Sequence, residues 1–246
     1  MMEWEKVPER EVHRALSSNA RVETLKLLYK RPHDIDEIAK KLNLQPVTMR
    51  HHILALQEAG LLESYEERTG AAGRPKTYYK IAKTLPNVSF PARRYLYFSK
   101  GIIHTLIHEL GQEKACEMLA QVGQEMGRET VKYLETAHSI KAWTPKEFAE
   151  VFVEKNLQEM GVEPEIVEKT DKKVVYRTHN CVFFELSQEL PNLMCDVLHS
   201  EFHQSLSKAM NKNTKIVQTK CMGHGEACCE QVFEWITGKQ ISNDLN

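Results

Sequence analysis

The hydrophobic and polar positions of residues 1–85 predict three helices followed by a β-hairpin. Apolar residues recur at steps of three and four in three successive segments, as they do on one face of a helix. Two segments of strand-like composition then flank a glycine-containing connection. The second and third helices enclose a four-residue turn, which is the spacing of a helix-turn-helix. The expected helices span residues 19–31, 35–42 and 46–59, and the expected strands span residues 61–68 and 76–82.

Residue types at the segment ends agree with these boundaries. Pro32 ends the first helix, and Asp34 suits the N-cap position of the second. Pro46 fits the first position of the third helix, and Gly60 follows its end. The second helix of a helix-turn-helix enters the major groove through its N-terminal residues. Residues 46–59 are therefore the expected recognition helix.

Polar residues on the outer side of this helix and in the hairpin are the candidate DNA contacts. The helix supplies donors and acceptors for base edges, and the hairpin places basic residues where a wing meets phosphates or the minor groove. The alternative is that these side chains are only solvated and that the domain binds protein. His52 is expected in the core. The predicted DNA-binding residues are Gln45, Thr48, Arg50, His51, Arg74 and Lys76.

This order of elements over residues 10–83 resembles the winged-helix domain of ArsR-type transcriptional regulators. The resemblance implies a regulator that binds a double-stranded DNA operator, with a homodimer reading two half-sites. Charge favours the same end of the chain: residues 1–85 hold 15 Lys and Arg against 12 Asp and Glu, a net charge of +3, which leaves −4 for the remainder. Residues 68–83 contain five basic residues and no acidic one.

Beyond a proline-containing linker, the pattern predicts an α+β fold. Long amphipathic helices, of the kind that commonly pack a dimer, precede segments that alternate as strands do. We expect a winged helix-turn-helix domain in residues 1–85, linker and dimerisation helices in residues 86–140, and a small α+β sensor domain in residues 141–246. The expected elements are helices over residues 95–110, 113–136, 145–160 and 195–210, and strands over residues 165–168, 173–178, 214–220 and 230–236.

Composition places the chain among ordinary globular proteins. Of its 246 residues, 41% are hydrophobic and 27% are charged, and no apolar run approaches the length of a membrane span. The charged N-terminus lacks the apolar core of a signal peptide. We therefore expect a cytoplasmic protein without a membrane partner.

Five of the six cysteines lie between residues 181 and 229. In a reducing compartment, such thiols indicate metal, redox or packing chemistry rather than disulfides. Glycines between the last of them permit the turns that bring sulfurs together. Cys228 and Cys229 are adjacent and would point to opposite faces of a strand, so we expect only one to be a ligand. The candidate metal ligands are Cys181, Cys195, Cys221, Cys228 and Cys229, with His199 and His203 more simply explained as part of a helix face.

A second resemblance rests on the order of motifs along the whole chain. Gly-Arg-Pro at residues 73–75, Met-Gly-Arg-Glu at 126–129, His-Asn-Cys at 179–181, Leu-Pro-Asn-Leu-Met-Cys at 190–195 and Gly-x-x-Cys-Cys at 225–229 are similar to those of SufR-type iron–sulfur repressors. The resemblance implies a cluster, such as a 4Fe–4S cluster, held by three cysteines that match Cys181, Cys195 and one of Cys228 or Cys229. The last pattern also resembles vinyl-reductase-type sensor domains of archaeal redox regulators.

The chain departs from the SufR pattern at two points that bear on the metal. Val182 stands where that family has proline, and Cys221 is an additional thiol. Four thiolates would equally suit a tetrahedral zinc site. The sequence therefore supports two hypotheses: a DNA-binding regulator gated by an iron–sulfur cluster or by thiol redox state, and a small-molecule-responsive regulator with structural zinc. We expect no enzyme, because no HExxH motif, phosphate-binding glycine loop or Ser-His-Asp order occurs.

Overall fold

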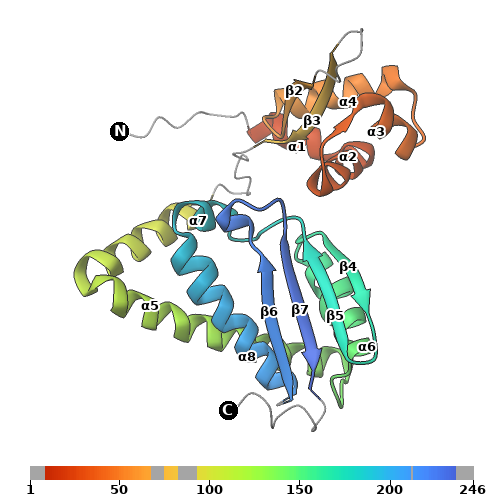
Figure 1. Cartoon of the computed structure of the whole chain (residues 1–246). Coiled ribbons are helices and arrows are strands. Elements are labelled where there is room, and N and C mark those ends of the chain that lie inside the picture. Colours follow the sequence, from red (N-terminus) through yellow and green to blue (C-terminus); the bar gives the residue numbers. More distant parts are fainter. Residues whose placement is uncertain (1–8, 68–74, 83–92, 212, 237–246) are drawn as a thin grey trace. The chain divides into compact units, whose positions relative to one another are not determined.

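The chain folds into two compact units, residues 1–93 and residues 94–246. The computed structural model describes residues 9–67, 75–82, 93–211 and 213–236 (Figure 1). No helix within these residues is long and apolar enough to cross a membrane. The long helices, for which the sequence predicts a separate segment, belong to the second unit.

The N-terminal unit has the predicted winged helix-turn-helix architecture. Helices α3 and α4 form the helix-turn-helix, and β2 pairs with β3 as an antiparallel hairpin. The sequence pattern does not predict α1 or the short strand β1, which pairs with the other edge of β3. The elements are α1 (Glu9–Leu16), α2 (Asn19–Lys30), β1 (His33–Asp34), α3 (Ile35–Lys41), α4 (Pro46–Glu58), β2 (Leu62–Glu67) and β3 (Lys76–Ile81).

The apolar stripes of these helices meet in one core. Ile38 of α3 and Met49, Ile53 and Leu56 of α4 are almost completely buried. Asp34 caps α3 as predicted, because its side chain accepts a hydrogen bond from the Glu37 amide at 2.9 Å. With one face of α4 held in this core, its opposite face is left to solvent.

The second unit is an α+β domain built on a four-stranded antiparallel sheet, as predicted. The strand order is β4-β5-β7-β6, and apolar residues of α5, η1 and α8 pack against the same inward-facing side chains of β5 and β7 (Figure 1). The elements are α5 (Tyr95–His138), α6 (Pro145–Glu147), the π-type helix η1 (Phe148–Leu157), β4 (Pro164–Lys169), β5 (Lys173–Thr178), α7 (Phe184–Glu189), the π-type helix η2 (Asn192–His199), α8 (Ser200–Met210), β6 (Thr214–Lys220), the short 3-10 helix η3 (Met222–His224) and β7 (Cys229–Trp235). The sequence pattern does not predict α7.

Gly111 divides α5 into the two helices that the sequence predicts. Its φ of 80° and ψ of 164° lie outside the helical region, in backbone space that glycine reaches without steric cost. The chain turns back on itself there, so the two halves of α5 run in different directions (Figure 1). The first half can therefore cover α7 and η2 while the second half packs along α8.

Two glycines one helical turn apart let the end of η2 and the start of α8 approach the second half of α5 closely. A Cβ atom at Gly123 would lie 2.2 Å from the Leu198 carbonyl oxygen, and one at Gly127 would lie 2.6 Å from the Phe202 carbonyl oxygen. The Ser205 hydroxyl donates to the Gln124 carbonyl oxygen at 2.7 Å across the same interface. Glycine is thus required at both positions for this helix spacing.

We expect Gly123→Ala to lower the free energy of unfolding of the chain by about 1–3 kcal/mol, because the added methyl group forces α8 away from α5. Gly101→Ala is the matched control: it lies in the same helix with no atom within 4 Å of its would-be Cβ. That substitution should raise the free energy of unfolding by about 0.5–1 kcal/mol. Chemical denaturation measures both values, and equal effects would contradict the role assigned to Gly123.

Candidate functional site

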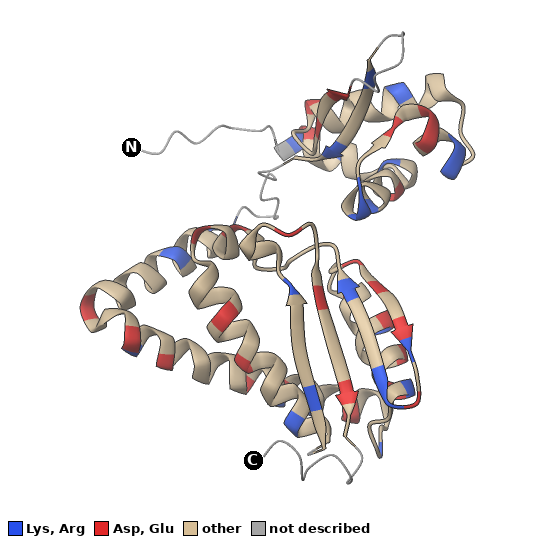
Figure 2. Ribbon diagram, viewed as in Figure 1, with Lys and Arg blue, Asp and Glu red and all other residues tan. Residues whose placement is uncertain are grey.

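The predicted base-reading residues lie on the solvent face of the recognition helix. Gln45 precedes α4, and Thr48, Arg50 and His51 occupy its first two turns; all four are exposed, while Met49 between them is buried. Basic and acidic segments are interspersed over the unit in the view of Figure 2. These residues are therefore marked out as candidate DNA contacts by their position at the start of α4, and not by a large basic surface.

Of the two predicted DNA contacts in the hairpin, the structure describes only one. Arg74 lies outside the described residues, whereas Lys76 is at the start of β3. The Lys76 ammonium group pairs with the Asp34 carboxylate at 2.8 Å, although the Lys76 side chain remains 57% exposed. Burial alone would raise the pKa of Asp34, but its hydrogen bonds to Lys76 and to the Glu37 amide lower it overall. Lys76 thus joins the hairpin to the cap of α3, a contact that the sequence did not indicate.

Four of the five candidate thiols come together where the loop after β6 approaches α7 and η2. The Cys221 thiol interacts with those of Cys195 and Cys229, and Cys181 is near enough to influence all three electrostatically. The Met222 amide donates a hydrogen bond to Cys229 Sγ at 3.3 Å. These four cysteines are called the thiol set below.

Gly223 allows the loop to reach the thiol set. A Cβ atom there would lie 2.5 Å from Cys195 Sγ and 3.2 Å from the Ser187 carbonyl oxygen. The Gln188 amide group donates to the Met222 carbonyl oxygen at 3.0 Å, which fastens the loop to α7. Gly223 thus lies against Cys195, as expected of a glycine that lets the terminal thiols approach the earlier ones.

Cys228 lies outside the thiol set although it adjoins Cys229. Burial raises the pKa of its thiol, and the charged groups that act on it are Lys220, Arg177, Glu230 and Glu165; none of the other cysteines is among them. Cys229 opens β7 with its side chain on the inward face, so the next residue back in the chain turns elsewhere. Of the two adjacent cysteines, Cys229 therefore lies near the other three thiols and Cys228 does not.

Three thiols of the set, those of Cys181, Cys195 and Cys229, hold their protons at neutral pH. Burial raises the pKa of Cys181 and of Cys195, and it raises the pKa of Cys229 to about 12, with neighbouring thiols adding to the last two shifts. A thiol in this state is a poor nucleophile. Among the described residues, no group of three or more His, Cys, Asp or Glu side chains is arranged so that it could hold a metal ion.

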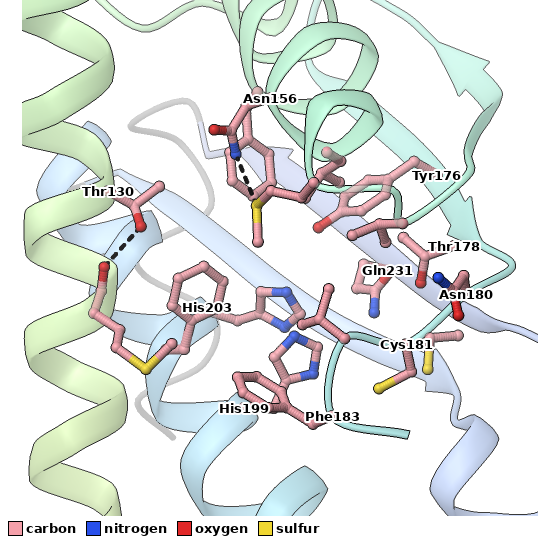
Figure 3. Close-up of a pocket in the computed structure, with 18 of the residues that line it drawn as sticks. Thr130, Asn156, Tyr176, Thr178, Asn180, Cys181, Phe183, His199, His203 and Gln231 are labelled. Carbon is pink, nitrogen blue, oxygen red and sulfur yellow. Dashed lines mark hydrogen bonds between the residues drawn. The ribbon is translucent and has the colours of Figure 1, made fainter. Parts of the chain in front are cut away.

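A cavity of about 120 Å³ adjoins the thiol set, between the sheet and the helices that cover it (Figure 3). Cys181 and Cys229 line it, so the two features share these side chains. No Lys, Arg, Asp or Glu is among the lining residues. They are Met126, Thr130, Phe152, Asn156, Leu157, Met160, Val162, Tyr176, Thr178, Asn180, Cys181, Val182, Phe183, Leu198, His199, Phe202, His203, Cys229 and Gln231.

Two histidines form one wall of the cavity, rather than an ordinary helix face or part of the thiol set. The rings of His199 and His203 lie 4.2 Å apart between centroids and point into the cavity (Figure 3). Burial lowers the pKa of His199 to about 4 and that of His203 well below its ordinary value. Both imidazoles are consequently neutral at physiological pH.

Two buried polar atoms project toward the cavity without a partner. Tyr176 and Gln231 are opposite each other on β5 and β7, so both side chains leave the sheet on the inward face, and each residue is only 1% exposed. Within the part of the chain that the structure describes, neither the Tyr176 hydroxyl nor Gln231 Oε1 has a hydrogen-bond partner. Neither residue was predicted from the sequence; the available signal was a Gln at an inward position of β7, between Cys229 and Phe233.

Comparison with known protein families gives one match in each unit. The family model described as bacterial regulatory protein, arsR family, matches residues 18–64. The model described as L-2-amino-thiazoline-4-carboxylic acid hydrolase matches residues 92–233, which is more than half of the chain. No curated protein matches the chain significantly.

Several solved structures match part of the chain at low sequence identity. The homodimeric winged helix-turn-helix DNA-binding domain of a Mycobacterium bovis protein described as "a possible ArsR-family transcriptional regulator" is 24% identical, with a TM-score of 0.27 over 41% of this chain and 82% of that one. Reduced HlyU from Vibrio cholerae is 17% identical, with a TM-score of 0.27 over 42% and 88%. The phenol-responsive sensory domain of the transcription activator PoxR is 12% identical, with a TM-score of 0.43 over 57% and 74%.

We expect the second unit to lose stability as the pH falls from 7.5 to 5. The unfolded chain takes up protons at its histidines below about pH 6.5, whereas the folded state keeps His199 neutral to about pH 4. At pH 5 this difference amounts to about 2 kcal/mol for His199 alone. His199→Phe should remove that part of the pH dependence in chemical denaturation. His108→Phe, at a histidine whose side chain is 84% exposed, should retain it, and an unchanged slope in His199→Phe would show that another group takes up the protons.

Proposed function

The chain belongs to the L-2-amino-thiazoline-4-carboxylic acid hydrolase family, and we propose that here this domain is a sensor that controls an ArsR-family DNA-binding regulator. The observation that carries the proposal is the absence of charge at its cavity. Every cavity-lining group that could act in catalysis is held in its uncharged form, and the described lining includes no Lys or Arg. Such a site can bind, but it is poorly equipped for hydrolysis.

The substrate in the family's name makes the contrast specific. That compound carries a carboxylate, which is strongly hydrated and needs a cationic or hydrogen-bond-rich partner when it is taken out of water. The neutral imidazoles of His199 and His203 do not supply a positive charge. Hydrolysis would also need an activated nucleophile, whereas the nearby Cys181 and Cys229 thiols hold their protons at neutral pH.

The DNA-binding part of the proposal rests on the exposed face of α4. Gln45, Thr48, Arg50 and His51 present donors and acceptors of the kind that read base edges in the major groove. We propose a homodimer as the DNA-binding species, since two-fold symmetry lets two recognition helices read half-sites one helical turn apart. A signal at the second unit would then change the relative setting of the two helices.

A second candidate function is gating through the thiol set, which the convergence of four sulfurs favours. As a donor set, four thiols suit zinc or an iron–sulfur cluster. In the described residues they are not arranged as a ready-made metal site, and burial raises the pKa of Cys181, Cys195 and Cys229. Cys181, Cys195, Cys221 and Cys229 would hold the metal after losing protons; without metal, they remain candidates for a redox-sensitive switch.

Arg50→Ala should weaken binding of the full chain to its operator, first identified by selection from random duplexes, by roughly 5- to 150-fold, since one good base contact is worth about 1–3 kcal/mol. Lys208→Ala removes one exposed positive charge from the second unit and should change the affinity little. Fluorescence anisotropy at fixed salt measures both. Equal affinities for the wild type and Arg50→Ala would remove α4 as the reading helix.

Adjacent cysteines provide a matched test of the thiol set. If it holds a metal, Cys229→Ser should lower the metal content of anaerobically purified protein, whereas Cys228→Ser should leave it unchanged. Absorption spectra with iron, sulfide and zinc analysis distinguish cluster from zinc. A metal-free wild type whose DNA affinity responds to peroxide only when Cys229 is present would indicate a redox switch. A wild type that contains no metal and ignores peroxide would exclude gating by the thiols.

A further inference from the structure

We propose that the cavity of the second unit binds a small, uncharged molecule with an apolar body and a polar group that both donates and accepts hydrogen bonds. This inference rests on the proposed sensor function, and it specifies the chemistry of the signal. A primary amide on a single ring or a short branched chain has the required form. The binding residues would be Tyr176 and Gln231 on the sheet, with His199, Phe202 and His203 on the opposite helix.

The size and lining of the cavity set the body of the ligand. Its volume of about 120 Å³ is close to that of engineered apolar cavities of about 150 Å³ that take up benzene. Phe152, Leu157 and Phe202 supply apolar walls from η1 and α8. A body of about one six-membered ring would therefore be covered on most sides.

The polar group of the ligand follows from the two unpaired atoms. Burying an amide or hydroxyl without a hydrogen bond is unfavourable, so adjacent orphans on one sheet face call for a common partner. Gln231 Oε1 accepts a hydrogen bond, and the Tyr176 hydroxyl can donate one. A primary amide fits this pair, because its N–H can donate to Gln231 while its carbonyl oxygen accepts from Tyr176.

The charge of the ligand follows from the remaining walls. No Lys or Arg lines the described cavity, so an anion would lose its hydration without a countercharge. No Asp or Glu lines it either, so a cation meets the same obstacle. Burial keeps the pKa of Tyr176 above its ordinary value and the pKa values of His199 and His203 below theirs, so these groups stay neutral as well.

The cavity shares lining residues with the thiol set and with the contact between the helices, so a bound molecule would contact both. Cys181 and Cys229 belong to both the cavity wall and the thiol set, and Leu198 connects the cavity to the close contact with Gly123 on α5. A ligand that fills the space between the sheet and α8 therefore bears directly on both elements. This shared wall gives the ligand a route to the thiols without requiring it to react with them.

Three probes of similar size test the proposal on the full chain: benzamide, benzoate and toluene. Isothermal titration calorimetry should give saturable binding of benzamide and at least about tenfold weaker binding of benzoate and toluene, since these lack neutrality and the polar group respectively. Tyr176→Phe and Gln231→Met should each weaken benzamide binding by about tenfold. Thr130→Val is the control: Thr130 lines the cavity, but its hydroxyl already donates to the Met126 carbonyl oxygen at 2.8 Å, so benzamide binding should be retained.

Several results would overturn the inference. Equal affinity for benzamide and toluene would show that the polar pair plays no part, and equal affinity for benzamide and benzoate would remove the argument from charge. No binding of any probe, together with a higher melting temperature of Tyr176→Phe, would mean that the polar atoms are only a structural cost. Benzamide binding without any change in operator affinity would support the cavity site while contradicting the proposed sensor function, so the two failures are distinguishable.

Discussion

The close packing of α8 against α5 is the constraint on which the second unit depends. Gly123 and Gly127 bring the backbones of the two helices within van der Waals contact. This spacing positions His199 at the end of η2 and Phe202 and His203 on α8, and these side chains form the cavity wall opposite the sheet. Interiors are packed as tightly as organic crystals, so such a constraint transmits displacement instead of absorbing it.

Helix η2 joins the cavity to the thiol set. Cys195 lies one turn before His199, in contact with Cys221 of the returning loop, and Cys181 and Cys229 belong to both features. The first half of α5 covers Cys195 and its apolar neighbours, and its Lys100 and His104 pair with Glu189 of α7. The first half of α5 thus lies against the cluster that contains Cys195, whereas its second half lines the cavity through Met126 and Thr130.

The fold was predictable where one residue pattern had a single structural reading. The Asp34 cap, Pro46 at the start of α4 and the inward stripe through Met49 determined the helix-turn-helix from local signals alone. The π-type winding of η1 and η2 was not predictable, because it depends on tertiary packing rather than on local spacing. Nor was α7, a short helix between two thiols that has no cap or long stripe to mark it.

The residues of the candidate sites could be predicted only where the residue type itself indicates the chemistry. Cysteines are recognisable in a sequence as potential metal ligands or redox groups, so a site built from them was predicted. Only the position of β7 in the folded chain separates Cys229 from Cys228. Tyr176 and Gln231 are ordinary residues whose significance lies in being opposite each other, buried and unpaired. That combination arises from the pairing of β5 with β7, strands that are distant in sequence.

We propose that a domain of a hydrolase family serves here as a sensor, because burial keeps the histidine and cysteine side chains that line its cavity uncharged. The most direct measurement is the loss of L-2-amino-thiazoline-4-carboxylic acid over time in the presence of the purified full chain. We expect no loss beyond the uncatalysed rate. Turnover by the wild type that disappears in Cys181→Ala, with that variant still folded, would contradict it.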